Sequence, residues 1–194
     1  MSFEESLKIP LDRVGVLIGK GGKVKKMIEE ECKVSLQIDS KSGDVTVKMT
    51  GSIEEANPFK AVEIVNAIGR GFSPERAFRL LEDGQTLLII DLREYVGKSR
   101  NSLIRIKGRI IGFKGKARRV IEELTGAYIS VYGHTVAIIG DVEQVRLAEE
   151  AVRLLASGSS HKTVYSMLQR ERTKKKLERL KLWEDTSLEE KGYI

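Results

Sequence analysis

The sequence predicts an α+β protein built from two copies of one small domain. Two observations support this. Sliding the 194-residue chain on itself by 93 positions places residues 18–30 over residues 111–123 without a gap, and seven of the thirteen positions are identical. The segments around each match then follow one order of elements: strand, helix, helix, strand, strand, helix.

Each element of the first copy has a local reason. KVSLQID, at 33–39, alternates apolar and polar residues, as half-buried strands do, and a second such run follows a loop rich in serine, glycine and charge. Apolar residues at helical spacing predict a closing helix, which Pro58 interrupts early and Gly69 and Gly71 end. The expected elements are a strand over 6–9, helices over 11–18 and 23–31, strands over 33–39 and 45–50, and a helix over 53–68.

The second copy repeats this order. We expect a strand over 86–91, helices over 99–107 and 116–124, strands over 127–132 and 135–139 joined at Gly133-His134, and a helix over 142–156. Between the copies, Ser73 and Pro74 have the character of an N-cap and a first helical residue, and Asp83-Gly84 ends this short helix. The linker is therefore expected to be ordered. The domain boundaries are 1–70 for the first domain, 71–84 for the linker, 85–157 for the second domain, and 158–194 for a basic helix with an acidic tail.

Positive charge is unevenly placed along the chain, whose formal net charge is +6. No acidic residue stands between Asp12 and Glu29 or between Glu94 and Glu122. The second window holds nine basic residues: Lys98, Arg100, Arg105, Lys107, Arg109, Lys114, Lys116, Arg118 and Arg119. A third basic run covers 170–181. Clustered positive charge without intervening acids indicates a polyphosphate partner such as nucleic acid.

A Gly-x-x-Gly turn between two helices suits such a partner. Its glycines allow a sharp bend and a close approach of a ligand backbone, and the following helix begins with a partial positive charge that favours phosphate. Beside the turns, Val14 and Ile18, and in the second copy Ile110 and Ile111, are expected to wall a groove for unstacked bases. The candidate RNA-binding residues are Gly19, Lys20, Gly21, Gly22, Lys23 and Lys26, then Gly112, Phe113, Lys114, Gly115, Lys116 and Arg119, and on the C-terminal helix Arg172, Lys174 and Lys175.

The order of elements and the twice-repeated I-G-x-x-G resemble the K homology (KH) RNA-binding domain in its strand-first, type I form. In that family the turn clamps the backbone of about four nucleotides. Phe113 departs from the pattern, because a polar or basic residue is usual at its position. It could stack on a base, pack against a partner protein or tuck against its own domain, and the last is the expectation that we favour.

Two longer segments narrow the resemblance. GRGFSPERAFRLL at 69–81 and the run at 103–133 closely resemble a ribosome-assembly family, in which this chain looks like the archaeal counterpart of the partner of the Nob endonuclease. The resemblance implies binding to small-subunit ribosomal RNA precursor near its 3′ end. It also implies partnership with the endonuclease that trims that end and with the adenosine dimethyltransferase acting nearby. Eukaryotic relatives tend to lose the first turn, but Gly19-Lys20-Gly21-Gly22 is intact here, so we expect the first domain to be active.

The sequence shows no motif typical of an enzyme. The glycines at 15–21 have the wrong spacing for a P-loop and lack its hydroxyl, and no G-x-G-x-x-G is completed. His134 and His161 have no obvious acidic partner in sequence, and Cys32, the single cysteine, is expected to be a small core residue. We therefore expect no catalytic residue, no metal and no cofactor.

Composition predicts a cytoplasmic protein, and we expect a monomer because nothing in the sequence suggests an obligate dimer. No apolar run is long enough to span a membrane, the first residues are acidic, and the scarcity of asparagine and glutamine is typical of hyperthermophiles. The alternative function is a protein-interaction adaptor that recruits rRNA-processing enzymes, with RNA contact secondary. The C-terminal helix at 161–183 bears on it, since its intermittent apolar stripe could dock on a partner, lie along RNA or stay partly disordered until bound. The stripe comprises Val164, Leu168, Leu177, Leu180 and Trp183, and the acidic residues 184–194 are expected to fray.

Overall fold

The structure is a computed structural model that describes residues 3–50, 56–97 and 99–190. The first domain contains β1 (Glu4–Lys8), α1 (Leu11–Ile18), α2 (Lys23–Cys32), β2 (Val34–Ile38), β3 (Asp44–Met49) and α3 (Pro58–Gly69). The linker contains α4 (Pro74–Ala77) and a 3-10 turn, η2 (Phe78–Leu81). The second domain contains β4 (Gln85–Asp91), α5 (Arg93–Val96), α6 (Arg100–Ile111), α7 (Lys116–Thr125), β5 (Tyr128–Tyr132), β6 (Thr135–Asp141) and α8 (Val142–Ala156), and α9 (His161–Glu190) follows.

The two domains have the same topology. Each contains a three-stranded antiparallel sheet in which the last strand lies in the middle, with the orders β1-β3-β2 and β4-β6-β5. In the first sheet, alternation places Val34 and Leu36 in the core, while Ser35 and Gln37 stay at least partly exposed. The prediction of an α+β fold in two similar domains is therefore confirmed.

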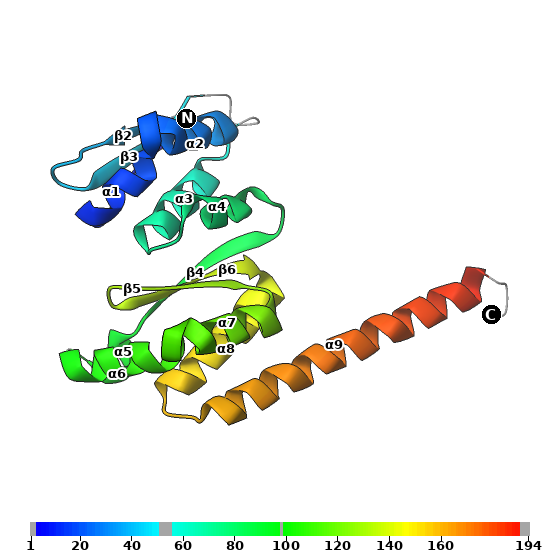
Figure 1. Cartoon of the computed structure of the whole chain (residues 1–194). Coiled ribbons are helices and arrows are strands. Elements are labelled where there is room, and N and C mark those ends of the chain that lie inside the picture. The colour runs from blue at the N-terminus through cyan, green and yellow to red at the C-terminus, as the bar shows by residue number, and fades with distance from the viewer. Residues whose placement is uncertain (1–2, 51–55, 98, 191–194) are drawn as a thin grey trace.

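The outer face of the second sheet is covered by the first domain. All residues of β6 from Thr135 to Gly140 are buried, because α6, α7 and α8 lie on one side of the sheet and α3 and α4 on the other (Figure 1). Ala137 and Ile139 belong to the same apolar cluster as Ile64 of α3 and Leu80 of the linker. This shared core gives the two domains a fixed mutual orientation, as the linker sequence predicts.

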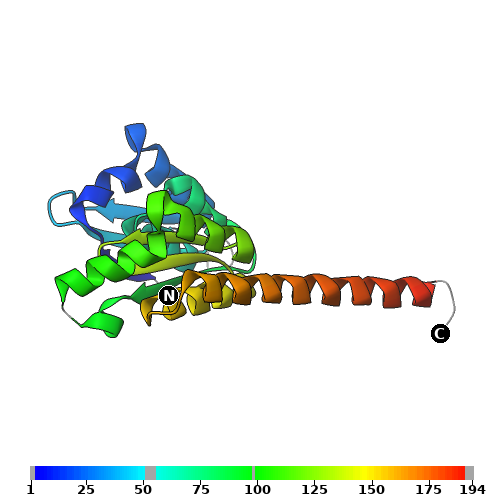
Figure 2. The same cartoon turned by 60° about the horizontal axis from the view of Figure 1, so that its bottom comes forward.

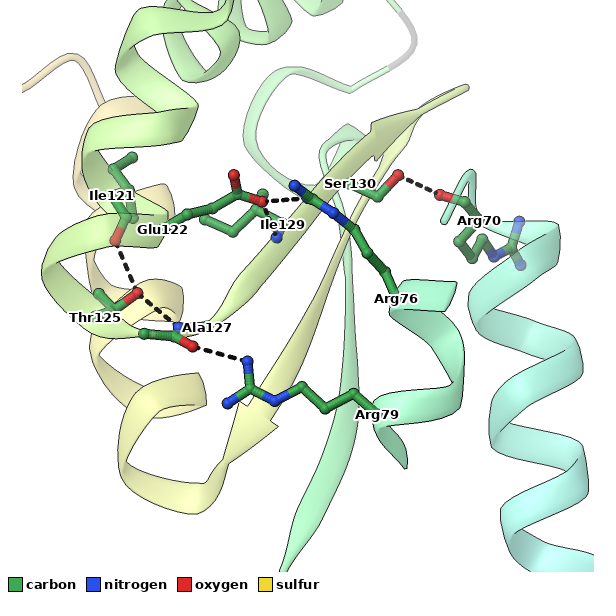
Figure 3. Close-up of polar contacts among 10 residues, drawn as sticks. Arg70, Arg76, Arg79, Ile121, Glu122, Thr125, Ala127, Ile129 and Ser130 are labelled. Carbon is green, nitrogen blue, oxygen red and sulfur yellow. Dashed lines mark hydrogen bonds and ion pairs between the residues drawn. The ribbon is translucent and has the colours of Figure 1, made fainter. Parts of the chain in front are cut away.

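Polar contacts reinforce the domain junction. Arg76 of α4 donates a 2.8 Å hydrogen bond to Glu122 of α7, and Arg79 donates a 3.0 Å bond to the carbonyl of Gly126 (Figure 3). Arg79 also donates a 3.0 Å bond to the Gln144 side chain. Both guanidinium groups lie over the ring of Tyr128, at 4.8 and 4.7 Å from its centroid. The linker thus packs between the two domains and holds them together.

Helix α9 packs on the second domain at its start and then projects from the body. Val164 and Leu168 are buried against the second-domain core, and the helix then runs outward as a straight rod (Figures 1 and 2). The helix extends to Glu190 and so includes part of the segment from 184 onward that the sequence predicts to fray. Residues 191–194 and the side chain of Trp183 lie outside the described part of the chain.

Several element boundaries differ from the predicted ones. β1 begins two residues early, at Glu4, and α6 continues past Lys107 to Ile111. The closing helix of the first domain begins at Pro58 rather than at 53, because the Asn57 side chain caps it by accepting the Lys60 N–H at 3.3 Å; residues 53–55 lie outside the described residues. α5 was not predicted at all. No described helix combines the length and the apolar character needed to cross a membrane.

Candidate nucleic-acid interface

The two Gly-x-x-Gly turns follow the same backbone path. The first glycine has φ and ψ of 71° and 173° in Gly19, and 71° and 175° in Gly112. The last glycine, which precedes the second helix, has 76° and 12° in Gly22, and 76° and 13° in Gly115. One geometry is therefore used twice, 93 residues apart.

Sterics explain the outer glycines of each turn. A β-carbon on Gly19 would lie 2.4 Å from a methyl group of Val24, and one on Gly112 would lie 2.6 Å from the β-carbon of Ala117. The first glycine thus lets the turn pack directly onto the second helix. Gly22 has open space around it and is needed for its left-handed backbone instead.

The first turn is exposed and carries cations. Lys20, Gly21, Lys23 and Lys26 are all exposed. Among the side chains that the structure describes, no carboxylate lies at ion-pair distance from these three lysines, while the neighbouring Lys25 pairs with Glu29 at 3.8 Å. The start of α2 thus presents positive charge to solvent, beside the positive end of the helix dipole.

The second turn has the same character with one difference. Lys114, Lys116 and Arg119 are exposed, and Arg119 donates a 3.1 Å hydrogen bond to the carbonyl of Lys114. Phe113 is 82% exposed, so the expectation that it tucks against its own domain was wrong. On this backbone path the position faces solvent in both copies, since Lys20 is exposed as well, and the Lys114 ammonium lies 5.4 Å from the centroid of the Phe113 ring.

The apolar wall beside each turn differs from the predicted one. Val14 and Ile110 are buried in the domain cores and cannot line a surface groove, while Ile18 and Ile111 are half-buried. Each wall also contains an apolar residue that was not predicted, on the same helical face and seven positions before Ile18 or Ile111. Leu11 is 58% exposed and its counterpart, Ile104, is 57% exposed.

A glycine stands at the centre of each apolar stripe. Gly15 lies between Leu11 and Ile18 on one face of α1, and Gly108 takes the same place on α6. Both are exposed, and a β-carbon on either would have nothing within 4 Å, so neither is required by packing. Extending the repeat upstream of residue 18 could have revealed this stripe from the sequence. A bare helix backbone flanked by apolar side chains allows a flat ligand to approach closely.

A glutamate ties each turn-bearing helix to the edge strand of its sheet. Glu29 accepts the Leu36 N–H at 2.8 Å, and Glu122 accepts the Ile129 N–H at the same distance. These two bonds also occupy equivalent positions of the repeat. They hold the helix that follows each turn, α2 or α7, against the edge strand in the same way in both domains.

Some basic residues of the acid-free windows serve the fold rather than a ligand. Lys107 donates to the carbonyl of Gly133 at 2.8 Å. Arg109 donates to the carbonyl of Leu155, in the last turn of α8, and to that of Ser159, just beyond the helix, and so fastens this helix end. Arg13 does the same for α3, at 2.8 Å to Ile68 and 2.6 Å to Phe72. Lys98 lies outside the described residues.

The basic residues of α9 separate into two roles. Arg172 and Lys174 are exposed, but Lys175 forms an ion pair with Glu143 in the first turn of α8 and so fastens α9 to the domain. Leu177 and Leu180, further along the rod, are about half exposed. In the described part of the chain, α9 packs against α7 and α8.

The remaining titratable candidates are structural. Burial, with a smaller contribution from Glu31, raises the pKa of the Cys32 thiol to about 11, and this side chain is in the core as predicted. His134 has an acidic neighbour that sequence order does not reveal, since its Nε2 lies 3.8 Å from Asp91. Hydrogen bonds from Arg93 lower the pKa of Asp91 to about 2. Within the part of the chain that the structure covers, no three His, Cys, Asp or Glu side chains gather as a metal site.

Two domains of this topology, each with a glycine turn between its first two helices, define a protein with tandem type I KH domains. Family models agree with this assignment. Residues 86–173 match the eukaryotic-type KH domain (KH-domain type I), and residues 4–66 match the KH domain.

Similar proteins narrow the class further. A KH domain-containing protein of Methanocaldococcus jannaschii is 53% identical over 186 residues, which cover 94% of this chain and 80% of the relative. A chain in the crystal structure of the a/eIF2alpha–aDim2p–rRNA complex from Pyrococcus horikoshii OT3 is 48% identical, with a TM-score of 0.83 and coverage of 89% of this chain and 96% of that one. The pre-rRNA-processing protein PNO1 of Chaetomium thermophilum is 30% identical over 84% of this chain and 65% of its own length. This chain belongs to the PNO1/Dim2 family of RNA-binding KH proteins, which confirms the resemblance noted in its sequence.

Proposed function

We propose that this protein binds single-stranded small-subunit ribosomal RNA precursor, near its 3′ end, during ribosome assembly. The observation that carries the proposal is the pair of exposed, cation-bearing glycine turns with one backbone path. Each precedes a ten-residue helix whose positive end favours phosphate, and each lies beside an apolar stripe suited to unstacked bases. The rRNA present in the complex of the Pyrococcus horikoshii relative supports the choice of RNA.

Binding to both turns is tested by reversing their charge. The double variants K20D/G21D and F113D/K114D should each weaken binding to a single-stranded RNA of the 3′-end sequence, measured by fluorescence anisotropy. A carboxylate at the turn repels phosphate, and aspartate tolerates the left-handed backbone of residues 21 and 114. The control K20N/G21N makes the same backbone demand without the negative charge and should lose less affinity. Unchanged binding by both aspartate variants would contradict the proposal.

Recruitment of processing enzymes is a second candidate function. The observation that favours it is the outer part of α9, which carries half-exposed Leu177 and Leu180 on a rod that projects from the body (Figure 2). We propose the 3′-end endonuclease and the adenosine dimethyltransferase as its partners, with this protein acting as a monomer. Replacing both leucines by serine should abolish co-purification with either enzyme and leave RNA affinity unchanged; retained co-purification counts against this role.

A further inference from the structure

The geometry points to Phe113 as a stacking platform for one nucleobase of the bound RNA, so that the second turn contacts a base as well as phosphate, whereas the first turn contacts the backbone alone. This inference rests on the proposed RNA binding and adds a base contact to it. The starting observation is an aromatic ring that is 82% exposed at the tip of the turn, where folding alone would favour a polar side chain.

The backbone of the turn holds this ring outward at a cost. Lys114 has φ of 49° and ψ of 32°, a left-handed conformation that is unfavourable for a residue with a side chain. The first copy uses Gly21 at this place, with φ of 62° and ψ of 25°. The second copy thus retains the turn despite the strain, and Arg119 braces it through the carbonyl of Lys114.

The surroundings of the ring select the class of ligand. The Lys114 ammonium lies over the ring, 5.4 Å from its centroid, and Lys116 and Arg119 are exposed on the following helix. An aromatic face beside several cations matches a nucleotide, whose base stacks on the ring while its phosphate meets the ammonium groups. The other residues of the turn itself are lysine and glycine, so cations stand next to the ring, whereas aromatic residues that dock proteins sit in desolvated pockets.

The repeat supplies the control for this inference within the same chain. Lys20 occupies in the first turn the position of Phe113 in the second, on a matching backbone path. Exchanging these two side chains therefore moves the aromatic ring from one domain to the other. Charge and stacking can also be told apart, because replacing Phe113 by alanine removes no charge and should leave the salt dependence of binding unchanged.

The test uses the full-length protein and a series of single-stranded RNA dodecamers, each with one base removed to leave an abasic ribose. For the unmodified protein, removing the base that stacks on Phe113 should lower affinity by about 5-fold to 150-fold, the range that base–aromatic stacking supplies. F113A should show that loss with intact RNA and be insensitive to the same abasic position, whereas F113W should bind like the parent. F113K should also be insensitive to that position, with a steeper salt dependence, and K20F should create sensitivity at a second position.

Stacking can be seen directly by fluorescence. In F113W/W183F the introduced tryptophan is the only one in the chain, and RNA should quench it less when the stacked base is absent. Affinities of F113A equal to those of the parent at every position would overturn the inference and assign the ring to a protein partner. If K20D/G21D and F113D/K114D also bind RNA normally, the proposed function itself fails, and the inference falls with it.

Discussion

Replacing Gly108 should change the stability of the fold and the affinity for RNA in opposite directions. It is exposed in the middle of α6, its counterpart Gly15 lies in α1, and a β-carbon added there meets nothing within 4 Å. Gly108 is also in regular helix, since its carbonyl accepts the Gly112 N–H at 2.8 Å. Replacing Gly108 by alanine should therefore stabilise the fold by about 1 kcal/mol, because alanine loses less backbone entropy on forming a helix.

The same methyl group should obstruct the apolar stripe between Ile104 and Ile111. A clash of this size costs about 1–3 kcal/mol, so RNA affinity should fall by roughly 5-fold to 150-fold. Guanidinium unfolding followed by circular dichroism measures the stability, and fluorescence anisotropy with single-stranded RNA measures the affinity. G108A would be a more stable protein that binds RNA less well.

Gly69 provides the matched control for this substitution. It is also in a helix, but a β-carbon there would lie 2.7 Å from a methyl group of Ile9, in the core. G69A should therefore destabilise the protein by about 1–3 kcal/mol through overpacking, with no direct effect on the RNA surface. A destabilised G108A, or a G108A with full RNA affinity, would refute the argument that the glycine is kept for a ligand.

Two further predictions concern the domain junction and the core. R76A should lower the free energy of unfolding by about 2 kcal/mol, because it removes a charge-assisted hydrogen bond to Glu122, discounted for the exposure of Arg76, and a cation–π contact with Tyr128. The control R146A, which breaks an exposed pair with Glu150, should cost under about 0.5 kcal/mol. Equal losses in the two variants would show that the contacts of Arg76 contribute no more to stability than an exposed ion pair. The second prediction concerns the raised pKa of Cys32. The folded state keeps the thiol proton to about pH 11, whereas the unfolded chain releases it near pH 9. Relative to C32A, the free energy of unfolding should therefore be unchanged below pH 9 and should fall by on the order of 2 kcal/mol as the pH rises to 11. Parallel pH profiles of C32A and the parent, measured by urea unfolding, would disprove it.

The duplication lets each domain serve as a reference for the other. Both copies keep the turn, the glycine-centred stripe and the glutamate that holds the edge strand, so these features serve a purpose common to both domains. They differ at Phe113 and in the outer face of the sheet, which is partly exposed in the first domain and covered in the second. The first domain therefore covers the outer face of the second-domain sheet, so this sheet is packed on both faces (Figure 1).

The sequence indicates the burial of β6, but a search for alternating apolar and polar residues does not detect this signal. The run at 135–140, TVAIIG, is almost continuously apolar, whereas the equivalent strand of the first domain, DVTVKM, alternates. A continuous run indicates a strand covered on both faces. The exposure of Phe113 also had a signal, because the repeat aligns it with the polar Lys20, but the general tendency of phenylalanine to be buried favoured the wrong prediction.

The amino-acid sequence alone determined the main helices and strands except α5, their order, the two glycine turns and the family. Each of these depends on residues within about a dozen positions of one another, where backbone preferences and apolar periodicity act directly. Only the tertiary structure decided which cations face solvent, which apolar residues line the surface and how the domains join. Arg109 bonds to carbonyls some fifty residues away and Arg76 reaches across the domain junction to Glu122. Such contacts arise when distant segments pack together, and no local pattern specifies them.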